Sequence, residues 1–397
     1  MANTTTQIQQ LLTRNIEDIF VEKHLAERLR KGDKLRIKFG IDPTGPNIHI
    51  GRAVPLWKLR EFQDLGHQLV IIIGDFTAQI GDPSDKLSKR PMLAVSQIKQ
   101  NLKTYQAQLG KILDIKKVEW RYNSEWLGKM NLTQVAHWAE SFSVQQMLAR
   151  RNFKDRWRAG NEISVRELLY PLMQGYDSVA VKADVELGGV DQLFNLQAGR
   201  VIQPLYEQPA QDIMTTQMLA GTDGRKMSTS WGNVITIMDE PEVMYGQAMS
   251  IKDELIPQYL LLATRLDQNN LNKITAALSQ GGNPRDIKTQ LAYELVKLYH
   301  GSKLAKQAQA EFELVHKKNQ LPTNIRKKKL STTPQNWSVV ELLVYLEMAP
   351  SKAAARRLIE QKGIKINKIT ITDWQRKIAV TSGTVIQVGN RQFVKIV

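Results

Sequence analysis

A strand, a turn, a helix and a second strand follow one another early in this chain, and they constrain its fold more than any other feature. The first strand, 36–40, ends at a glycine, and the turn at 42–46 contains two prolines that cannot continue it. A helix is predicted from Ala53 to Gly66, and the run at 69–73 is continuously apolar, as in a strand buried on both faces. Strands joined in this way run parallel, so the sequence predicts an α/β fold whose ligands bind beyond the carboxyl ends of a parallel sheet.

Length and charge narrow the class of protein. At 397 residues the chain predicts about two to three domains. A net charge of +16 predicts either a polyanionic partner such as nucleic acid or only a basic solvated surface, and charge alone leaves both open. The absence of cysteine from the sequence excludes disulfides, thiolate metal sites and a cysteine nucleophile. No secretory signal pattern is present and the longest apolar run is too short to span a bilayer, so a cytoplasmic protein without membrane contact is expected.

The character of the sequence changes beyond Pro241, where helical patterns dominate. Three helices are predicted at 256–266, 271–279 and 284–314. Residues 317–337 then combine prolines, polar residues and a run of four cations, which predicts a basic and poorly ordered linker. These patterns separate a helical unit from the α/β unit before it and from the tail after it.

The tail is a small basic unit of mixed structure. Two helices and three short strands are predicted, at 338–348, 351–361, 364–367, 385–388 and 393–396. Ten Lys or Arg stand against four Asp or Glu between residue 338 and the end of the chain. Such a module suits the phosphate backbone of RNA. Its candidate RNA contacts are Lys352, Arg356, Arg357 and Lys362.

Two short segments indicate nucleotide chemistry. Residues 48–52 open the helix after the first turn, where backbone N–H groups can hold a phosphate. There His49 could donate to a charge that develops in a transition state, or it could be a structural histidine. Gly51 would let a base or ribose approach the backbone closely. Residues 224–230 place two cations and three hydroxyl groups after a glycine, a composition suited to a loop that closes over phosphates.

A third set of polar residues indicates a small-molecule pocket. Tyr170, Gln174 and Asp177 share one stripe of a predicted helix, at spacings i, i+4 and i+7. Apolar residues surround them, so the stripe fits a polar ligand in a dry pocket, and a capped surface stripe is the alternative that periodicity leaves open. Thr77 and Asp82, which follow the second apolar strand, could complete the pocket, with Asp82 pairing an ammonium group.

Five motifs, all in one order, resemble those of bacterial tyrosyl-tRNA synthetases, which are class I aminoacyl-tRNA synthetases. The match is dense from about residue 35 to residue 240 and looser through the helical region. It is recovered in the tail, which resembles an S4 RNA-binding domain. One motif would be weak evidence, whereas five in order carry the resemblance. The motifs are 38–44 leading to 49–51, 74–84, 170–177, 188–192 and 226–228.

The resemblance implies a Rossmann-type catalytic domain over residues 1–240, with an inserted helical dimerisation segment at about 90–180. An α-helical tRNA-binding domain (241–320), a basic linker (321–337) and an S4-like domain (338–397) would follow. The implied enzyme joins L-tyrosine to ATP as tyrosyl-adenylate, releases pyrophosphate, and transfers tyrosine to the 3′-terminal adenosine of tRNA(Tyr). Mg²⁺ would accompany the ATP, no tightly bound cofactor or protein metal site is implied, and the enzyme would be a homodimer.

The resemblance also implies roles for individual residues by position. Asp177 would accept a hydrogen bond from the substrate phenol, Gln192 would contact the carboxylate region, and Asp191 would bind the ribose. The residues implied for tyrosine are Lys38, Thr77, Asp82, Tyr170, Gln174, Asp177 and Gln192. Those implied for ATP are Gly40, Asp42, His49, Gly51, Arg52, Gly189, Asp191, Lys226, Ser228 and Thr229. Those implied for catalysis, which stabilise the pyrophosphate, are Thr44, His49, Lys226 and Thr229.

Three positions depart from the family pattern. Many relatives have a second histidine where this chain has Arg52 and a second lysine where it has Thr229. We therefore expect Lys226 to be the main cation of its loop, with Arg225 as a helper, and Arg52 to replace part of the charge missing at 229. Lys38 stands where one branch of the family places a tyrosine near the phenol.

Two alternatives remain at this stage. A tryptophanyl-tRNA synthetase shares the fold and both phosphate-binding segments, and Asp177 on its stripe together with the S4-like tail argues against it. A non-catalytic RNA-binding protein built around the tail is the other. The presence of His49, Asp191 and Lys226 argues against that alternative.

Overall fold

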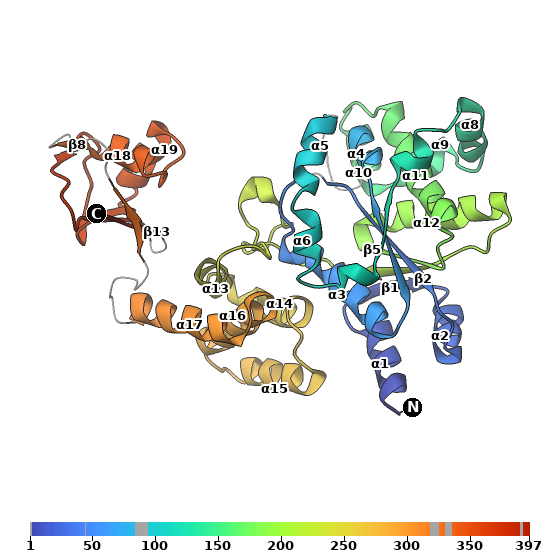
Figure 1. Ribbon diagram of the computed structural model, residues 1–397, viewed down its shortest axis with the longest axis horizontal. Helices are drawn as coiled ribbons and strands as arrows, with labels where there is room; N and C mark the ends of the chain where they lie inside the picture. Colours follow the sequence, from blue (N-terminus) through green and yellow to red (C-terminus); the bar gives the residue numbers. More distant parts are fainter. Residues whose placement is uncertain (1, 44, 84–93, 318–324, 330–335, 390–391) are drawn as a thin grey trace. The chain divides into compact units, whose positions relative to one another are not determined.

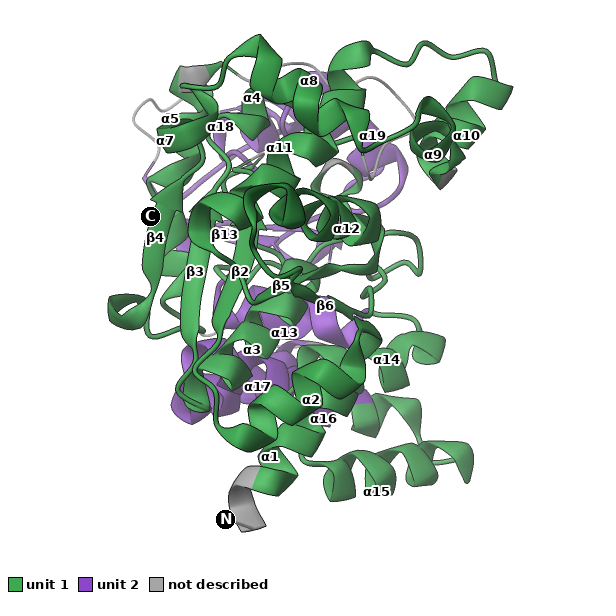
Figure 2. Cartoon of the chain, turned by 90° about the vertical axis from the view of Figure 1, so that its right-hand side faces the viewer, with its two compact units in different colours: residues 1–239, 251–287 green, residues 240–250, 288–397 purple. Residues whose placement is uncertain are grey.

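The computed structural model describes residues 2–43, 45–83, 94–317, 325–329, 336–389 and 392–397 (Figure 1). The chain forms two compact units, coloured separately in Figure 2. Unit 1 comprises Met1–Asp239 and Ile251–Ile287, and unit 2 comprises Glu240–Ser250 and Lys288–Val397. Within the described ranges, no helix has the length and apolar character needed to cross a membrane.

A six-stranded sheet in the order β1-β6-β5-β2-β3-β4 forms the centre of unit 1. Strands β2 to β6 run parallel to their neighbours, and β1 at the edge runs antiparallel to β6. The predicted α/β fold with a parallel sheet is therefore confirmed. The strands are β1 Ile16–Phe20, β2 Arg36–Ile41, β3 Gln68–Ile73, β4 Glu119–Tyr122, β5 Val185–Gly189 and β6 Asp212–Thr216.

Helices cover both faces of this sheet. In Figure 1 the sheet is seen nearly edge-on, with α3 and α6 on one face and α11 and α12 on the other. The helices of unit 1 are α1 Ala2–Thr13, α2 Glu22–Lys31, α3 Ile50–Asp64, α4 Thr77–Ile80, α5 Val95–Leu102, α6 Tyr105–Leu109, α7 Ser124–Leu127, α8 Leu132–Glu140, α9 Val144–Ala149, α10 Arg151–Arg158, α11 Val165–Val181, α12 Leu193–Ile202, α14 Ile256–Ala263 and α15 Gln268–Ser279.

The β2–α3–β3 unit is the one that the sequence predicts. Strand β2 pairs with β3 along its whole length, from Arg36 opposite Gln68 to Ile41 opposite Ile73. Helix α3 begins at Ile50, within the segment 48–52 that was expected to open it, and His49 caps it: the His49 Nδ1 accepts a hydrogen bond from the backbone N–H of Arg52 at 3.2 Å.

The strand order reverses between β2 and β5, which makes this the switch point of the sheet. The two strands pair at only two positions, Ile37 opposite Val185 and Lys38 opposite Glu186, and the ladder between them stops there. The crevice beyond the carboxyl ends of strands at a switch point is where open α/β sheets bind their ligands.

The segment at 90–180 is not the purely helical insertion that was expected. Its residues Glu119–Tyr122 form β4, the edge strand paired with β3, and α11 packs extensively against α12 on the sheet. The helices α8, α9 and α10 in this segment are short, and Ser143 starts α9 with a capping box of its own.

Unit 2 contains helices and two small sheets. Its helices are α13 Pro241–Met249, most of α16 Pro284–His300, α17 Ser302–Lys317, α18 Val339–Tyr345 and α19 Lys352–Glu360. Its strands are β7 Arg326–Lys328, β8 Trp337–Ser338, β9 Ile364–Ile366, β10 Ile369–Thr370, β11 Lys377–Ile378, β12 Val385–Val388 and β13 Gln392–Ile396. They form sheets in the orders β10-β9-β12-β13-β7 and β11-β8.

Three boundaries in this region differ from those predicted. The helix expected at 284–314 ends before Gly301, whose positive φ of 86° terminates α16. The helical domain expected at 241–320 is divided, because α14 and α15 belong to unit 1. The expected linker at 321–337 includes β7, whose backbone completes the edge of the tail sheet by pairing in parallel with β13.

Candidate active site

A cavity of about 760 Å³ opens at the switch point of the unit 1 sheet. Its walls come from the carboxyl ends of the parallel strands, the start of α3, the middle of α11 and the loop after β6. Of the residues predicted for tyrosine, ATP and catalysis, Lys38 does not line it and Thr44 lies outside the described residues. The others all line it: Gly40, Asp42, His49, Gly51, Arg52, Thr77, Asp82, Tyr170, Gln174, Asp177, Gly189, Asp191, Gln192, Lys226, Ser228 and Thr229.

The two segments predicted to bind phosphate, far apart in sequence, both line the cavity. The first is joined to the chain just after the second: the backbone N–H of Ile50 donates to the carbonyl of Ile235 at 2.9 Å, and that of Ile237 donates to the carbonyl of Ile48 at 3.0 Å. A Cβ added at Gly51 would lie 3.0 Å from the Sδ of Met227. A side chain at position 51 would thus crowd the loop at 226–229, a packing reason for Gly51 that sequence reasoning did not identify.

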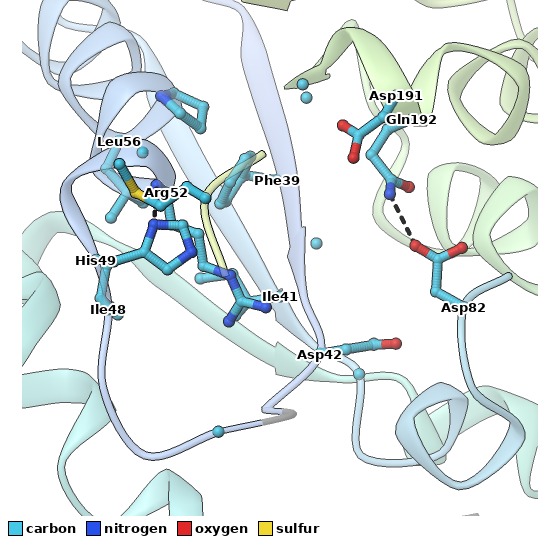
Figure 3. Close-up of a pocket in the computed structure, with 18 of the residues that line it drawn as sticks. Phe39, Ile41, Asp42, Ile48, His49, Arg52, Leu56, Asp82, Asp191 and Gln192 are labelled. Carbon is cyan, nitrogen blue, oxygen red and sulfur yellow. Dashed lines mark hydrogen bonds between the residues drawn. The ribbon is translucent and has the colours of Figure 1, made fainter. Parts of the chain in front are cut away.

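His49 is a neutral hydrogen-bond donor toward the cavity. Because its Nδ1 accepts from the Arg52 backbone, the ring proton resides on Nε2. Burial, reinforced by the positive charge of Arg52, lowers the pKa of His49 from 6.5 to about 3. In Figure 3 the side chains of His49 and Arg52 lie together on one side of the cavity and face Asp191 and Gln192 across it.

The loop after β6 is held in place by Asn233. Its Oδ1 accepts from the Ser228 backbone at 2.8 Å, and its Nδ2 donates to Asp223 at 2.8 Å and to the carbonyl of Lys226 at 3.1 Å. The ammonium of Lys226 lies 3.6 Å from the carboxylate of Asp191. Arg225, expected as a helper, is instead bound by Asp223 at 2.6 Å and does not line the cavity.

Asp177 is the buried acceptor of the pocket, with 3% of its surface exposed. It accepts hydrogen bonds from Trp126 Nε1 at 2.8 Å and from Asn123 Nδ2 at 3.3 Å. Burial raises the pKa of Asp177 from 3.8 to about 7, against the opposing effect of the Lys38 charge. Asn123 and Trp126 were missed from the sequence because they follow β4, a strand that was not predicted.

Asp42, just after β2, is hydrogen-bonded to the polar residues expected to bind tyrosine. One of its oxygens accepts from the hydroxyl of Tyr170 at 2.8 Å and the other from that of Thr77 at 2.8 Å. A Cβ at Gly74 would lie 1.9 Å from Asp42 Oδ1, so only glycine fits at that position. Asp42, which the resemblance places in the ATP site, therefore shares a hydrogen-bond network with two residues implied for tyrosine.

Asp82 and Gln192 form the wall across from this network. The side-chain Nε2 of Gln192 donates to Asp82 Oδ2 at 2.7 Å, and Asn195 Nδ2 donates to the side-chain oxygen Oε1 of Gln192 at 2.9 Å. Figure 3 shows Asp82 and Gln192 turned toward one another at the cavity edge. Asn195, which sequence reasoning did not include, thus fixes how the Gln192 amide is oriented.

Lys38 lies behind the cavity wall rather than in it. Its side chain is fully buried and its Nζ reaches three protein acceptors: the Gln174 carbonyl at 2.7 Å, Ser178 Oγ at 2.7 Å and Glu186 Oε1 at 2.9 Å. All three donors of the ammonium are thereby satisfied within the protein, so Lys38, implied for tyrosine, does not line the cavity.

The candidate RNA contacts lie on the exposed face of α19 and just after it, opposite the buried Ala355 and Ile359. The ammonium of Lys352 pairs with Glu341 at 2.9 Å, and the guanidinium of Arg356 lies 4.4 Å above the centre of the Trp374 ring. The exposed cations of this group are Lys352, Arg356, Arg357 and Lys362.

Comparison with known proteins agrees with this geometry. Residues 30–317 match the model of the class I tRNA synthetases (W and Y), and residues 339–379 match that of the S4 domain. The tyrosine–tRNA ligase of Thermotoga maritima is 45% identical over 389 residues, covering 98% of this chain and 96% of that protein. The tyrosine–tRNA ligase of Dehalococcoides mccartyi is 43% identical over 399 residues, covering 100% of both.

Solved structures share the fold. A C-terminally truncated mitochondrial tyrosyl-tRNA synthetase of Aspergillus nidulans aligns with a TM-score of 0.64 at 24% identity, over 78% of this chain and 94% of that one. A tyrosyl-tRNA synthetase of Archaeoglobus fulgidus aligns with a TM-score of 0.62 at 21% identity, over 77% and 99%. Taken with the full-length relatives and the cavity at the switch point, these matches place the chain in the class I tRNA synthetases, in the family of the tyrosine–tRNA ligases.

Proposed function

We propose that this protein activates L-tyrosine with ATP and then esterifies tRNA(Tyr) with it. The observation that carries the proposal is that one cavity contains both a buried carboxylate, Asp177, and the two segments suited to phosphates. A phenol hydroxyl can donate to Asp177, because a carboxylate has about four acceptor positions and the two protein donors occupy only part of them. The cavity therefore suits an amino acid with a polar end and a nucleotide together.

The first step needs charge stabilisation more than proton transfer. The tyrosine carboxylate oxygen attacks the α-phosphorus of ATP, a new P–O bond forms, and the bond to pyrophosphate breaks, so the leaving group gains negative charge. His49 Nε2–H, Lys226 and Arg52 line the cavity where that charge would develop, and Thr229 supplies a hydroxyl beside them. Preorganised donors of this kind stabilise a transition state without reorganising during the reaction.

The magnesium ion expected with ATP fits best as part of the substrate. In the part of the chain that the structure describes, no three His, Asp or Glu side chains converge in a way that could hold a metal. Phosphate oxygens would then be its main ligands, as for many magnesium–nucleotide complexes. When bound, the ion would neutralise phosphate charge, and the residues named above would orient the chain of phosphates.

The assay that tests this function is amino-acid-dependent exchange of pyrophosphate into ATP, run with tyrosine, tryptophan and phenylalanine. We expect exchange with tyrosine and little with the other two. Phenylalanine has no phenol hydroxyl to donate to the buried Asp177. The cost of removing water from Asp177 is then not offset by a hydrogen bond, so phenylalanine should bind more weakly than tyrosine. An absence of exchange with tyrosine, or faster exchange with tryptophan, would contradict the proposal.

For the transfer step we infer that the tail binds tRNA through α19. Its four exposed cations lie on or beside one helix, which suits contacts to phosphates. In a variant with alanine at all four positions, pyrophosphate exchange should be unchanged and tRNA charging should be weaker. The slope of the logarithm of the tRNA-binding constant against the logarithm of the salt concentration should become shallower by about one for each lost phosphate contact. Unchanged charging would refute this role.

We also infer self-association through the helical part of unit 1. Four large apolar side chains in it are strongly exposed: Leu132 by 83%, Val144 by 60%, Trp157 by 66% and Val165 by 71%. All four lie between residues 132 and 165, in the segment that the resemblance implies for dimerisation, and large exposed apolar surfaces are typical of interfaces. The mass in solution, measured by light scattering, should be that of a dimer. Trp157→Glu should shift it toward the monomer, whereas Met218→Glu, at an exposed residue outside this region, should not.

A further inference from the structure

A buried ion pair lies at the floor of the cavity, where the backbone ladder between β2 and β5 ends. Lys38 and Glu186 are opposite one another at the last paired position of these two strands. Their side chains are 0% and 1% exposed, and Lys38 Nζ lies 2.9 Å from Glu186 Oε1. Beyond them Gly40 and Gly188 already line the cavity. The pair therefore joins the two halves of the sheet immediately beneath the site.

Glu186 is held by several hydrogen-bond donors besides Lys38. Glu186 accepts from Gln174 Nε2 at 3.0 Å, from Ser178 Oγ at 3.1 Å and from Gln211 Nε2 at 2.5 Å, in addition to Lys38. Replacing a buried ion pair by apolar residues of similar size is often neutral or stabilising, so such a pair is weak evidence for a role in stability. A role in the site explains its presence better.

The first consequence concerns Gln174, which lines the cavity. Glu186 as a carboxylate can only accept hydrogen bonds, so the amide NH₂ of Gln174 must point to it. The carbonyl oxygen of Gln174 is then the group that this side chain offers to a ligand. The backbone carbonyl of the same residue accepts from Lys38, which fixes α11 at this point. An acceptor is the group that a substrate ammonium requires.

The second consequence concerns Asp177, one turn further along α11. Lys38 places a positive charge behind this carboxylate and opposes its protonation. Two titratable groups that interact with it electrostatically are Glu186 from β5 and Tyr170 from its own helix. Asp42 and Asp82 act on Tyr170 from the strand ends. Lys38 therefore acts together with the hydrogen bonds from Trp126 and Asn123 to favour the carboxylate form of Asp177, against the effect of burial.

We propose that the Lys38–Glu186 pair is a positioning unit for the amino-acid substrate, which holds the Gln174 carbonyl toward the ammonium and keeps Asp177 an acceptor for the phenol. This role rests on the proposed tyrosine activation. Neither side chain touches the substrate, so both act through residues that do. The unit is contributed by three elements, β2, β5 and α11, which meet only in the folded chain.

The test compares two buried ion pairs in the full-length protein. The variants are Lys38→Met, Glu186→Gln and the double variant Lys38→Met/Glu186→Gln, in which neither charge is left alone. The matched control is Arg156→Met/Glu167→Gln, which removes an equally buried ion pair that does not line the cavity. In that pair each side chain is 1% exposed, and 2.8 Å separates a guanidinium nitrogen of Arg156 from Glu167 Oε1. Tyrosine-dependent and ATP-dependent KM values are measured by pyrophosphate exchange, and unfolding temperatures are recorded alongside.

The double variant should raise the KM for tyrosine by about tenfold or more, the effect of one lost hydrogen bond to a charged ligand, with the KM for ATP within about twofold. The control should leave both KM values unchanged even where it lowers the unfolding temperature. The KM for tyrosine should increase as the pH is lowered and Asp177 becomes protonated. In Lys38→Met the pH at which this increase occurs should be about one unit higher than in the wild type, and the control should not change it.

Parallel increases in both KM values, or a double variant that behaves like the control, would overturn the positioning role. If Lys38→Met does not fold, the double variant decides the question, because it leaves no buried charge without a partner. The wild-type protein is assayed in the same series. Failure of wild type to exchange with tyrosine contradicts the proposed function, whereas normal wild-type exchange with unaffected variants contradicts the positioning role alone.

Discussion

Asp177 should lower the stability of the fold at neutral and alkaline pH, and Asp177→Asn should reveal this. The carboxyl is buried, and burial raises its pKa from 3.8 to about 7. For an acid whose pKa is higher in the folded state, the folded state binds the proton more tightly. Stability is therefore unaffected below pH about 4, falls as the pH rises from about 4 to about 7, and stays low above that.

The magnitude follows from the size of the shift. A rise of about three pKa units corresponds to about 4 kcal/mol of destabilisation at pH 8 and about 2 kcal/mol at pH 5. Asparagine cannot ionise, so it removes this pH-dependent destabilisation. Its NH₂ group would, however, face Asn123 Nδ2, which donates to Asp177 at 3.3 Å in the wild type. Loss of that hydrogen bond costs about 1 kcal/mol. The Trp126 bond at 2.8 Å can be kept by the amide oxygen. We expect the variant to be more stable than wild type by about 3 kcal/mol at pH 8 and by about 1 kcal/mol or less at pH 5.

The assay is urea unfolding of both proteins at pH 5, 6, 7 and 8, following the transition that L-tyrosine shifts upward in the wild type. The difference between the two proteins cancels the other titrating groups. Exchange activity with tyrosine should fall in the same variant, because function maintains a costly charge in the pocket. A stability difference that does not change with pH, or a less stable variant at pH 8, would refute the reasoning.

Three further changes test other parts of the site. His49→Ala removes the neutral Nε2–H donor and should lower the rate of adenylate formation by about 100-fold with little change in either KM, as measured in single turnovers. Gly74→Ala places a methyl group 1.9 Å from Asp42 Oδ1 and should raise the KM for tyrosine at least about tenfold; wild-type kinetics would show that this glycine is dispensable. Arg52→Ala and Thr229→Lys, alone and combined, form a cycle read by adenylate formation, in which Thr229→Lys should rescue Arg52→Ala, and simple additivity would exclude the compensation of charge.

Local patterns predicted the elements whose signals lie within a few residues. The β2–α3–β3 unit has clear apolar periodicity, and α11, Val165–Val181, is the helix on which Tyr170, Gln174 and Asp177 were placed. The two segments predicted to bind phosphate were chosen by residue type, and in the structure both line one cavity. These elements could be predicted because the residues that determine them are neighbours in the sequence.

Elements that depend on a neighbouring strand were missed. Strand β4 is four residues long and β7 three, and each exists because its backbone pairs with an adjacent strand, β3 and β13 respectively. Sequence patterns carry little information about such pairing, since its energy comes from backbone hydrogen bonds that are the same for every residue type. Missing β4 also hid Asn123 and Trp126, the two donors to Asp177.

The sequence by itself determined the parallel α/β sheet and the chemical types needed for the site, because hydrophobic periodicity, turn residues and motif chemistry are local properties. Only the tertiary structure decided which of those groups face a ligand. Lys38 has the residue type of a binding cation, yet Gln174, Ser178 and Glu186 satisfy it behind the wall. Burial and partner choice depend on residues about 140 positions away in the chain, and these meet only when β2, β5 and α11 pack together.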